Sequence, residues 1–412
     1  MDINWKKNTA LFLTGQALSF FGTMTVQYAI LWHITLDTQS GAMMTVFTIA
    51  AFLPTFVISP FAGVWADRFN RKYIINIADG AIALVSLLAA VFIRTGVDNI
   101  VGILFVCTII RSFGQGVQTP AVGAFIPDIV PQEQLMRING LQSSIFSFIN
   151  LTAPAASGAL MTFAPLETLF FLDVVTAAIG IGVVLFLVKM PEKEKTFATD
   201  ATEQNSVAYF RDLKAGMSYI RQHGYILRII ILSAIFLFFF APASFLTPLQ
   251  VTRTFGHEVW RLSAIEIVFS VGMMAGGLLI GVWGGFKNRI HTMTLSCALA
   301  GLLTVGLGLA PAFSLYLAVM GILGVSFPLW NAPFMTMLQT TVDAAFMGRV
   351  MSVFMMVSST MMPLGMLVFG PVADTVSIET LLIGTGVVVA LLCIPMAGSR
   401  TLREAGRNFS GN

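Results

Sequence analysis

Four ionisable residues stand inside long apolar stretches of the sequence, namely Asp79, Arg111, Asp173 and Glu266. A charged side chain near the centre of a bilayer costs about 2.5–3.5 kcal/mol on insertion scales, so such residues face a cavity or one another. Burial also disfavours the charged form of a carboxyl group. Reversible protonation of these acids is therefore the first chemistry that the sequence suggests, with a proton loaded on an acidic side and released on the other.

For each acid, proton coupling competes with another interpretation. Glu266 is our first choice for a proton carrier and Asp173 the second, both expected near the outer ends of their helices. For both, the alternative is an acid at a helix N-terminus that accepts hydrogen bonds from loop backbone. Asp79 lies little more than a turn from the end of its apolar stretch. We expect it to join a charge network around Asp67 and Arg68, and proton coupling is the alternative.

Composition places the surrounding chain in lipid. Of its 412 residues 56% are hydrophobic and only 10% are charged, with a mean hydropathy of +0.84, whereas soluble domains are typically about 25% charged. The net charge of +3 argues against a nucleic-acid partner. The chain has no P-loop that would indicate an ATP-driven pump.

Cysteine and histidine are scattered through the sequence. The three cysteines have no disulfide or metal-ligand spacing, and the four histidines fall near expected helix ends; they are Cys107, Cys297, Cys393, His33, His223, His257 and His291. We therefore expect no metal site, no catalytic residues and no enzyme.

Twelve apolar stretches have the roughly 20 residues that a membrane-spanning helix needs. They lack the alternating pattern of barrel strands, so we predict an all-α membrane protein. The expected helices are 9–33, 42–66, 73–94, 98–120, 138–162, 167–188, 226–250, 260–284, 290–310, 313–338, 348–373 and 378–397.

The positive charges give the expected orientation. With the N-terminus inside, every Lys and Arg falls on the cytoplasmic side except Arg94, Arg111, Arg253 and Arg261. Positive charge is enriched in cytoplasmic loops, so we expect both termini in the cytoplasm.

The long polar interval 189–225 separates an N-terminal bundle of six helices, 1–188, from a C-terminal one, 226–412. Within it, Ser206 to Arg221 has apolar residues at helical spacing. This pattern predicts an amphipathic helix on the inner membrane surface or a solvated linker helix.

A repeat relates the two bundles. The turn Gly63-Val64-Trp65-Ala66-Asp67-Arg68-Phe69-Asn70-Arg71-Lys72 has a counterpart in Gly281-Val282-Trp283-Gly284-Gly285-Phe286-Lys287-Asn288-Arg289. Each half has an even number of helices, so the copies run in the same direction. Parallel pseudo-symmetric bundles are typical of one class of secondary transporter, with the substrate site between the halves.

The first copy, Gly63-x-x-x-Asp67-Arg68-x-x-Arg71-Lys72, resembles the signature loop of the major facilitator superfamily. Asn70 replaces a usual glycine, and asparagine also tolerates a left-handed backbone. Three further stretches are similar to bacterial macrolide-efflux-type drug/proton antiporters: Arg111-Ser112-Phe113-Gly114, Pro131-Gln132-Glu133-Gln134-Leu135 and Ile265-Glu266-Ile267.

This resemblance implies a conformational latch, in which Asp67 faces the N-terminal end of helix eleven near Arg349. A carboxylate gains about 0.3–1 kcal/mol there. Gly63, Arg68 and Arg71 would complete the latch, whereas Lys72 needs no role beyond topology. Arg111 corresponds to a helix-four arginine that the family links to proton movement, although the spacing Arg111-x-x-Gly114 departs from the family pattern. Otherwise Arg111 is a structural partner for one of the acids.

The resemblance thus implies a proton-coupled exporter of amphipathic drugs such as macrolides, in a bacterial cytoplasmic membrane. It would act as a monomer without a cofactor, with protons, lipid and a small substrate as partners. The alternatives are export of a natural metabolite, such as a siderophore or lysolipid, and a receptor that transports nothing. Aromatic and amide side chains are the substrate-cavity candidates: Gln27, Tyr28, Gln115, Gln118, Asn150, Phe239, Phe240, Trp330 and Asn331.

Overall fold

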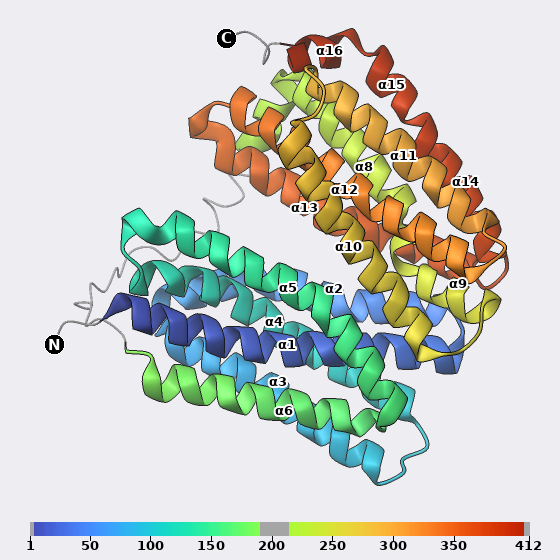
Figure 1. Ribbon diagram of the computed structural model, residues 1–412. Coiled ribbons are helices and arrows are strands. Elements are labelled where there is room, and N and C mark those ends of the chain that lie inside the picture. Colours follow the sequence, from blue (N-terminus) through green and yellow to red (C-terminus); the bar gives the residue numbers. More distant parts are fainter. Residues whose placement is uncertain (1–3, 190–213, 408–412) are drawn as a thin grey trace. The chain divides into compact units, whose positions relative to one another are not determined.

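The computed structural model describes residues 4–189 and 214–407 (Figure 1). These residues are almost entirely helical and contain no strand. Twelve of the described helical stretches are long and apolar enough to cross a membrane. The predicted all-α, twelve-helix fold is confirmed.

The first six spans begin with α1 (Trp5–Thr38), α2 (Gly41–Arg68) and α3 (Arg71–Arg94). After them come α4 (Ile100–Ile129), α5 (Leu135–Phe163) and α6 (Leu166–Gly182). The 3-10 turn Gln132–Gln134 precedes α5, and the π-helical turn Val183–Leu187 extends α6. The prediction ended helix four at residue 120, but α4 continues past Pro120 and Pro127. Membrane helices tolerate internal proline because neighbouring groups satisfy the freed backbone.

The remaining spans begin with α8 (Gly224–Phe245) and α9 (Thr247–Thr254), which together form the seventh. They continue with α10 (Val259–Trp283), α11 (Arg289–Leu309) and α12 (Phe313–Thr341). The chain then forms α13 (Ala344–Val372), α14 (Ile378–Leu391), α15 (Cys393–Gly398) and the short α16 (Arg400–Arg407).

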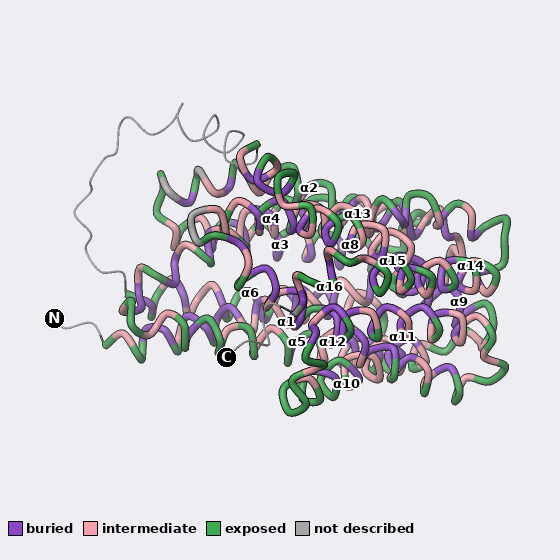
Figure 2. The backbone as a smooth tube through the Cα atoms, turned by 90° about the horizontal axis from the view of Figure 1, so that it is seen from above, coloured by how far each residue is buried: buried purple, intermediate pink, exposed green. Residues whose placement is uncertain are grey.

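Two compact units contain these helices. The first comprises residues 1–39, 46–194 and 257–267, and the second comprises 40–45, 195–256 and 268–412. The first turn of α2 therefore belongs to the second unit, and the start of α10 belongs to the first. Both units consist of long helices that bury one face and expose another, as the alternating colours in Figure 2 show.

The first unit has its core between α1, α3, α4 and α6. The rings of Phe12 and Phe125, tilted against one another with centroids 4.6 Å apart, join α1 to α4. Gly22 lets α1 approach α6, since a Cβ atom there would lie 2.0 Å from Thr176 Oγ1. This approach brings polar residues of α1 against α6.

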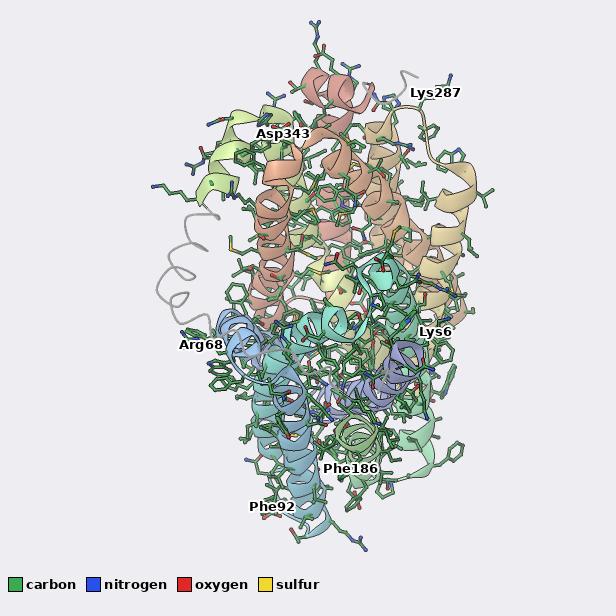
Figure 3. The ribbon with its side chains drawn as sticks, turned by 90° about the vertical axis from the view of Figure 1, so that its left-hand side faces the viewer. Lys6, Arg68, Phe92, Phe186, Lys287 and Asp343 are labelled. Atoms are coloured by element: carbon green, nitrogen blue, oxygen red, sulfur yellow. The ribbon has the colours of Figure 1, made fainter. Side chains whose placement is uncertain are left out.

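The second unit packs α11 against α12 and α14, and α8 against α13. At Gly301 of α11, an added Cβ would lie 2.2 Å from the backbone nitrogen of Ala390 in α14. The surfaces of both units carry large apolar side chains, including Phe163 (89% exposed) and Val282 (91% exposed). Phe92 and Phe186, labelled in Figure 3, are also at the surface. Such surfaces suit a lipid environment.

The two copies of the repeat share their local structure. Asn70 caps α3 by accepting a 3.1 Å hydrogen bond from the backbone N–H of Lys72, and Asn288 caps α11 in the same way, at 3.0 Å from Ile290. Arg71 donates to the carbonyl of Ala66 (Nε to O, 2.8 Å), and Arg289 likewise donates to the carbonyl five residues before it. The repeat in sequence is therefore a repeat in structure.

The left-handed backbone considered for Asn70 does not occur, because this residue is extended, with φ −65° and ψ 111°. Left-handed residues occur in the second copy, at Gly284 (φ 72°) and Gly285 (φ 78°). There the helix ends at Trp283, whereas α2 continues helically through the matching positions to Arg68. This difference explains why the second copy has glycines where the first has Ala66 and Asp67.

Of the amphipathic helix expected over residues 206–221, residues 206–213 lie outside the described part, and 214–222 are helical. Tyr219 and Ile220 are buried. The Tyr219 ring stacks on Phe346 at 4.7 Å and its hydroxyl donates to Asp343 (3.2 Å). The described end of this helix thus packs on the beginning of α13.

Candidate ion-coupling and substrate site

Arg111 and Asp173 form a fully buried ion pair between α4 and α6. Ser86 of α3 donates to Asp173 Oδ2 at 2.7 Å and also accepts a hydrogen bond from Arg111. Thr23 of α1 donates to Asp173 Oδ1 at 3.3 Å, and its backbone carbonyl accepts from Arg111 at 3.1 Å. Four helices therefore meet around one pair of opposite charges.

This arrangement agrees with the interpretation of Arg111 as a structural partner for an acid. Removing one member of a buried ion pair leaves an uncompensated charge and destabilises a protein by about 3–5 kcal/mol. Asp173 therefore has one cationic partner and two hydroxyl donors inside the bundle.

Asp79 of α3 is also buried, with 2% of its surface exposed, but its partners are uncharged. It accepts hydrogen bonds from Gln118 (2.6 Å), Ser19 (2.9 Å) and Gln16 (3.4 Å). Gln118 also donates to Gln16 Oε1 at 3.3 Å. These contacts define a polar cluster of two glutamines, a serine and a carboxylate between α1, α3 and α4.

The expected network of Asp79 with Asp67 and Arg68 is wrong for Arg68, which is exposed at the end of α2. The side chain of Asp67 lies outside the described residues. Asp79 instead points into the bundle, because Gln16 and Ser19 of α1 and Gln118 of α4 supply donors there.

The polar residues of α1 connect the two clusters. Gln16 and Ser19 contact Asp79, and Thr23 contacts Asp173. Positions i, i+3 and i+7 share one helix face, so this spacing could have indicated the polar ridge in the sequence. Gln16, Ser19 and Thr23 were not among the predicted site residues.

Glu266, near the start of α10, is half-buried in the first unit. Within the described part of the chain it has no hydrogen-bonding partner, and it lies within electrostatic range of the Tyr28 hydroxyl of α1. The Tyr28 ring in turn lies 5.5 Å from the ring of Trp32. The structure therefore associates the first-choice acid with one substrate-cavity candidate.

Of the other substrate-cavity candidates in the first unit, Gln118 belongs to the Asp79 cluster. Gln27 and Gln115 are half-buried, and Asn150 is exposed.

In the second unit, Trp330 and Phe240 are buried on either side of Phe236, at ring distances of 4.8 Å and 5.5 Å. Phe239 contacts Phe369 at 5.9 Å. Asn331 is exposed. Phe240 of α8 and Trp330 of α12 thus share one packed cluster, whereas Phe239 packs on Phe369 of α13.

The predicted latch residues lie at the end of α2 and near the start of α13. Arg71 binds Asp128 at 2.8 Å and the carbonyl of Ala124 at 2.9 Å, which ties the α2–α3 turn to α4. Gly63 has open space at its Cβ position, and Arg349 lies over the Phe346 ring at 5.3 Å.

Lys72 has a contact that the sequence did not suggest. Its Nζ donates to the carbonyls of Leu185 (2.9 Å) and Val188 (2.7 Å) at the end of the sixth span. This cation holds the end of a helix, where such charges complement the helix dipole. In the described residues, no three His, Cys, Asp or Glu side chains gather as metal ligands would.

The fold and these clusters define a class. Twelve apolar helices that bury an ion pair and a further carboxylate form a multi-pass membrane protein with charge inside its helix bundles. Intramembrane ionisable residues of this kind mark the pathways of substrates and ions.

Comparison with known proteins identifies the family. The family model described as Major Facilitator Superfamily matches residues 12–366, and the chain belongs to this superfamily of transporters. Macrolide efflux protein A from Streptococcus pyogenes is 29% identical over 400 residues, covering 95% of this chain and 96% of the relative. The protein of the same name from Enterococcus faecalis is 29% identical over 80% of this chain and all of its own.

A solved structure has the same fold. The crystal structure of a D-xylose-proton symporter matches with a TM-score of 0.68 at 13% identity, covering 94% of this chain and 96% of the symporter. Fold and relatives together indicate a transporter with homology to macrolide efflux proteins.

Proposed function

We propose that this transporter exports amphipathic drugs of the macrolide class in exchange for protons. The likeness to Macrolide efflux protein A over 95% of the chain supports the substrate class.

The observation that carries proton coupling is the environment of Asp79. It is a buried carboxylate whose three hydrogen-bond donors are all uncharged. A buried charge without a counter-ion is strongly unfavourable, and protonation removes it. Asp173, by contrast, has Arg111 as its counter-ion. Asp79 is therefore our choice for the exchangeable proton, ahead of the sequence-based choices.

Glu266 has the second role in this proposal. Its lack of a hydrogen-bonding partner in the described residues and its proximity to Tyr28 suit an acid that meets the cargo rather than a fixed ion pair. Arg111 and Asp173 hold α4 against α6 beside the polar ridge of α1. Protonation of Asp79 would alter the hydrogen bonds that join α3 to α1 and α4.

The proposed setting follows from the same reasoning. The protein lies in a bacterial cytoplasmic membrane as a monomer with both termini in the cytoplasm. The proton gradient supplies the energy without a cofactor, and protons enter from the acidic outer side. Asp67 and Arg349 form the latch at the cytoplasmic end, and the protein catalyses no reaction.

Purified protein in liposomes tests the proposal. An imposed proton gradient should drive radiolabelled erythromycin across the membrane, and a protonophore should stop this transport. Drug transport at the same rate with and without the proton gradient would contradict coupling. No drug movement, with transport of a metabolite or of nothing, would support the natural-metabolite exporter or the receptor instead.

A further inference from the structure

The short helix α16 is fastened to the end of the second unit at which α8 and α11 begin (Figure 1). Arg228 of α8 donates to the hydroxyl of Ser399 at 3.1 Å and to that of Thr401 at 2.9 Å. Asn288, the N-cap of α11, donates to the carbonyl of Arg403 at 3.0 Å. Two independent side chains therefore fix the position of α16 within this unit.

The apolar face of α16 is covered by protein. Leu402 is fully buried, and Gly406 lies so close to α11 that an added Cβ would be 2.1 Å from Asn288 Oδ1. An interfacial helix usually inserts its apolar face among lipid headgroups, but this one has only polar groups left to offer. Of its described side chains, the exposed ones are Arg400, Arg403 and Glu404. Arg400 and Glu404 form an ion pair at 2.7 Å, which leaves Arg403 as the uncompensated charge among them.

The turn between α10 and α11 brings two more cations to this place. Lys287 and Arg289 flank Asn288 in the chain, and Lys287 is exposed (Figure 3). Arg289 donates to the carbonyl of Gly284. The hydrogen bond from Asn288 joins this turn to the backbone of Arg403. In the part of the chain that the structure describes, none of these three cations forms an ion pair with a carboxylate.

Large apolar side chains are exposed on the same turn. Val282 is 91% exposed, Trp283 40% and Phe286 43%, and the last two rings lie 4.9 Å apart. Aromatic residues collect where the hydrocarbon of a bilayer meets the headgroups, and basic residues at that level attract anionic lipids. A soluble anion gains nothing from apolar surface beside its binding site. The combination therefore favours a lipid over a free phosphate.

We propose that Lys287, Arg289 and Arg403 bind the phosphodiester group of an anionic phospholipid. The acyl chains of this lipid lie along the apolar side chains of the same turn, and its headgroup joins α16 to the α10–α11 turn. The site depends only on the membrane location of the protein. It is independent of the drug, of proton coupling and of the direction of transport.

The first copy of the repeat has no equivalent set of available cations. Arg71 forms an ion pair with Asp128 at 2.8 Å. Lys72 donates to the carbonyls of Leu185 and Val188. Both positive charges are thus engaged within the first unit, and the second copy alone combines its cations with a basic helix.

Fluorescence quenching by brominated lipids tests the site. Purified full-length protein in detergent is titrated with dibrominated phosphatidylglycerol or dibrominated phosphatidylcholine, and the part of the quenching that Trp283→Phe removes is measured. Each Lys or Arg near an anionic surface strengthens the attraction about fivefold. Phosphatidylglycerol should therefore saturate this signal at a concentration about tenfold lower than phosphatidylcholine.

Charge removal gives the second arm of the test. Lys287→Gln with Arg403→Gln should raise the half-saturating concentration of phosphatidylglycerol about tenfold and leave that of phosphatidylcholine unchanged. Lys7→Gln with Arg137→Gln, at two exposed cations of the first unit, is the matched control and should change neither. Lys287→Arg with Arg403→Lys keeps both charges and should bind like the parent protein, which separates lost charge from lost folding.

Three results would overturn the proposal. The first is equal half-saturation by the two lipids, and the second is an equal effect of the test and control pairs of substitutions. The third is displacement of phosphatidylglycerol by the same concentration of glycerol phosphate, because the site would then be one for soluble phosphates.

Discussion

Gln118 of α4 donates the shortest of the three hydrogen bonds to Asp79 of α3, at 2.6 Å, and at the same time contacts Gln16 of α1. One amide therefore links three helices through a buried carboxylate. The protonation state of that carboxylate decides which of these hydrogen bonds can form, because a protonated carboxyl group can itself donate. Chemistry at Asp79 is in this way connected to the packing of the bundle.

Replacing Gln118 should weaken gradient-driven export. A hydrogen bond to a charged group contributes about 1.5–3 kcal/mol, which corresponds to about tenfold or more in an equilibrium constant. We expect Gln118→Leu to lower erythromycin transport in liposomes by about tenfold. Gln132→Leu, at an exposed amide in the turn before α5 and outside the Asp79 cluster, is the control, and equal losses in both variants would refute the role of Gln118.

The buried ion pair predicts compensation between two variants. Arg111→Gln leaves the buried Asp173 without its counter-ion, so the thermal stability in detergent should fall strongly, in line with about 3–5 kcal/mol for a broken buried pair. The double variant Arg111→Gln with Asp173→Asn removes both charges and should recover most of the loss. Melting curves from intrinsic fluorescence measure both, and a double variant no more stable than the single one would contradict the pairing.

Gly22 makes a steric prediction. An added Cβ would lie 2.0 Å from Thr176 Oγ1, and overpacking typically costs about 1–3 kcal/mol. Gly22→Ala should therefore lower the melting temperature, and adding Thr176→Ala should restore part of it. Gly182, which has open space at its Cβ position, is the matched control, and its alanine variant should melt like the parent protein.

The two copies of the repeat should respond differently to substitution. Asp67→Asn should impair export with little effect on stability, because we assign Asp67 to the cytoplasmic latch. Gly285→Ala should mainly destabilise, since a left-handed backbone costs a non-glycine residue about 1–2 kcal/mol. Transport rates and melting temperatures of both variants separate the two effects. The assignment fails if the two positions tolerate substitution equally.

Asp374, at the end of α13, caps α2 by accepting hydrogen bonds from the backbone N–H groups of Gly41 and Ala42. This cap should be insensitive to pH in the physiological range. Burial alone would raise the pKa of Asp374, but hydrogen bonds from Ala42, Gly41, Ser40 and Arg253 outweigh it and hold the pKa below its ordinary value of 3.8. A lowered pKa gives stabilisation that is complete above the ordinary pKa and is lost only as the pH falls through the lowered one. The rate at which an impermeant thiol reagent labels Thr45→Cys in the first turns of α2, divided by the rate in unfolded protein, should stay constant between about pH 8 and pH 5. A steady rise over that interval would contradict the charged cap.

Hydropathy alone was enough to predict the helices, because each span must bury its own backbone hydrogen bonds and present apolar residues to lipid. The predicted end of α4 at residue 120 came too early, because a criterion of about 20 apolar residues finds the part that crosses the bilayer and not the full length of the helix, which ends at Ile129. The backbone of Asn70 was mistaken because a capping asparagine and a left-handed one look alike in sequence.

The site was harder to predict, since its contacts join residues far apart in the chain. The ionisable positions Asp79, Arg111 and Asp173 stood out against apolar surroundings, but which of them pair depends on how α1, α3, α4 and α6 pack. Charge alone did not reveal Gln16 and Ser19. Asp374 lies in a loop where an acid is ordinary, and only the fold brings it to α2.

Asp79→Asn in liposomes tests the central claim most directly. We compare gradient-driven erythromycin transport with erythromycin exchange at equal pH on both sides, using Asp98→Asn, an exposed acid, as the control. The account predicts that Asp79→Asn loses gradient-driven transport and keeps exchange, because an amide mimics the protonated acid but cannot release a proton. Gradient-driven transport at the parental rate in Asp79→Asn would contradict it.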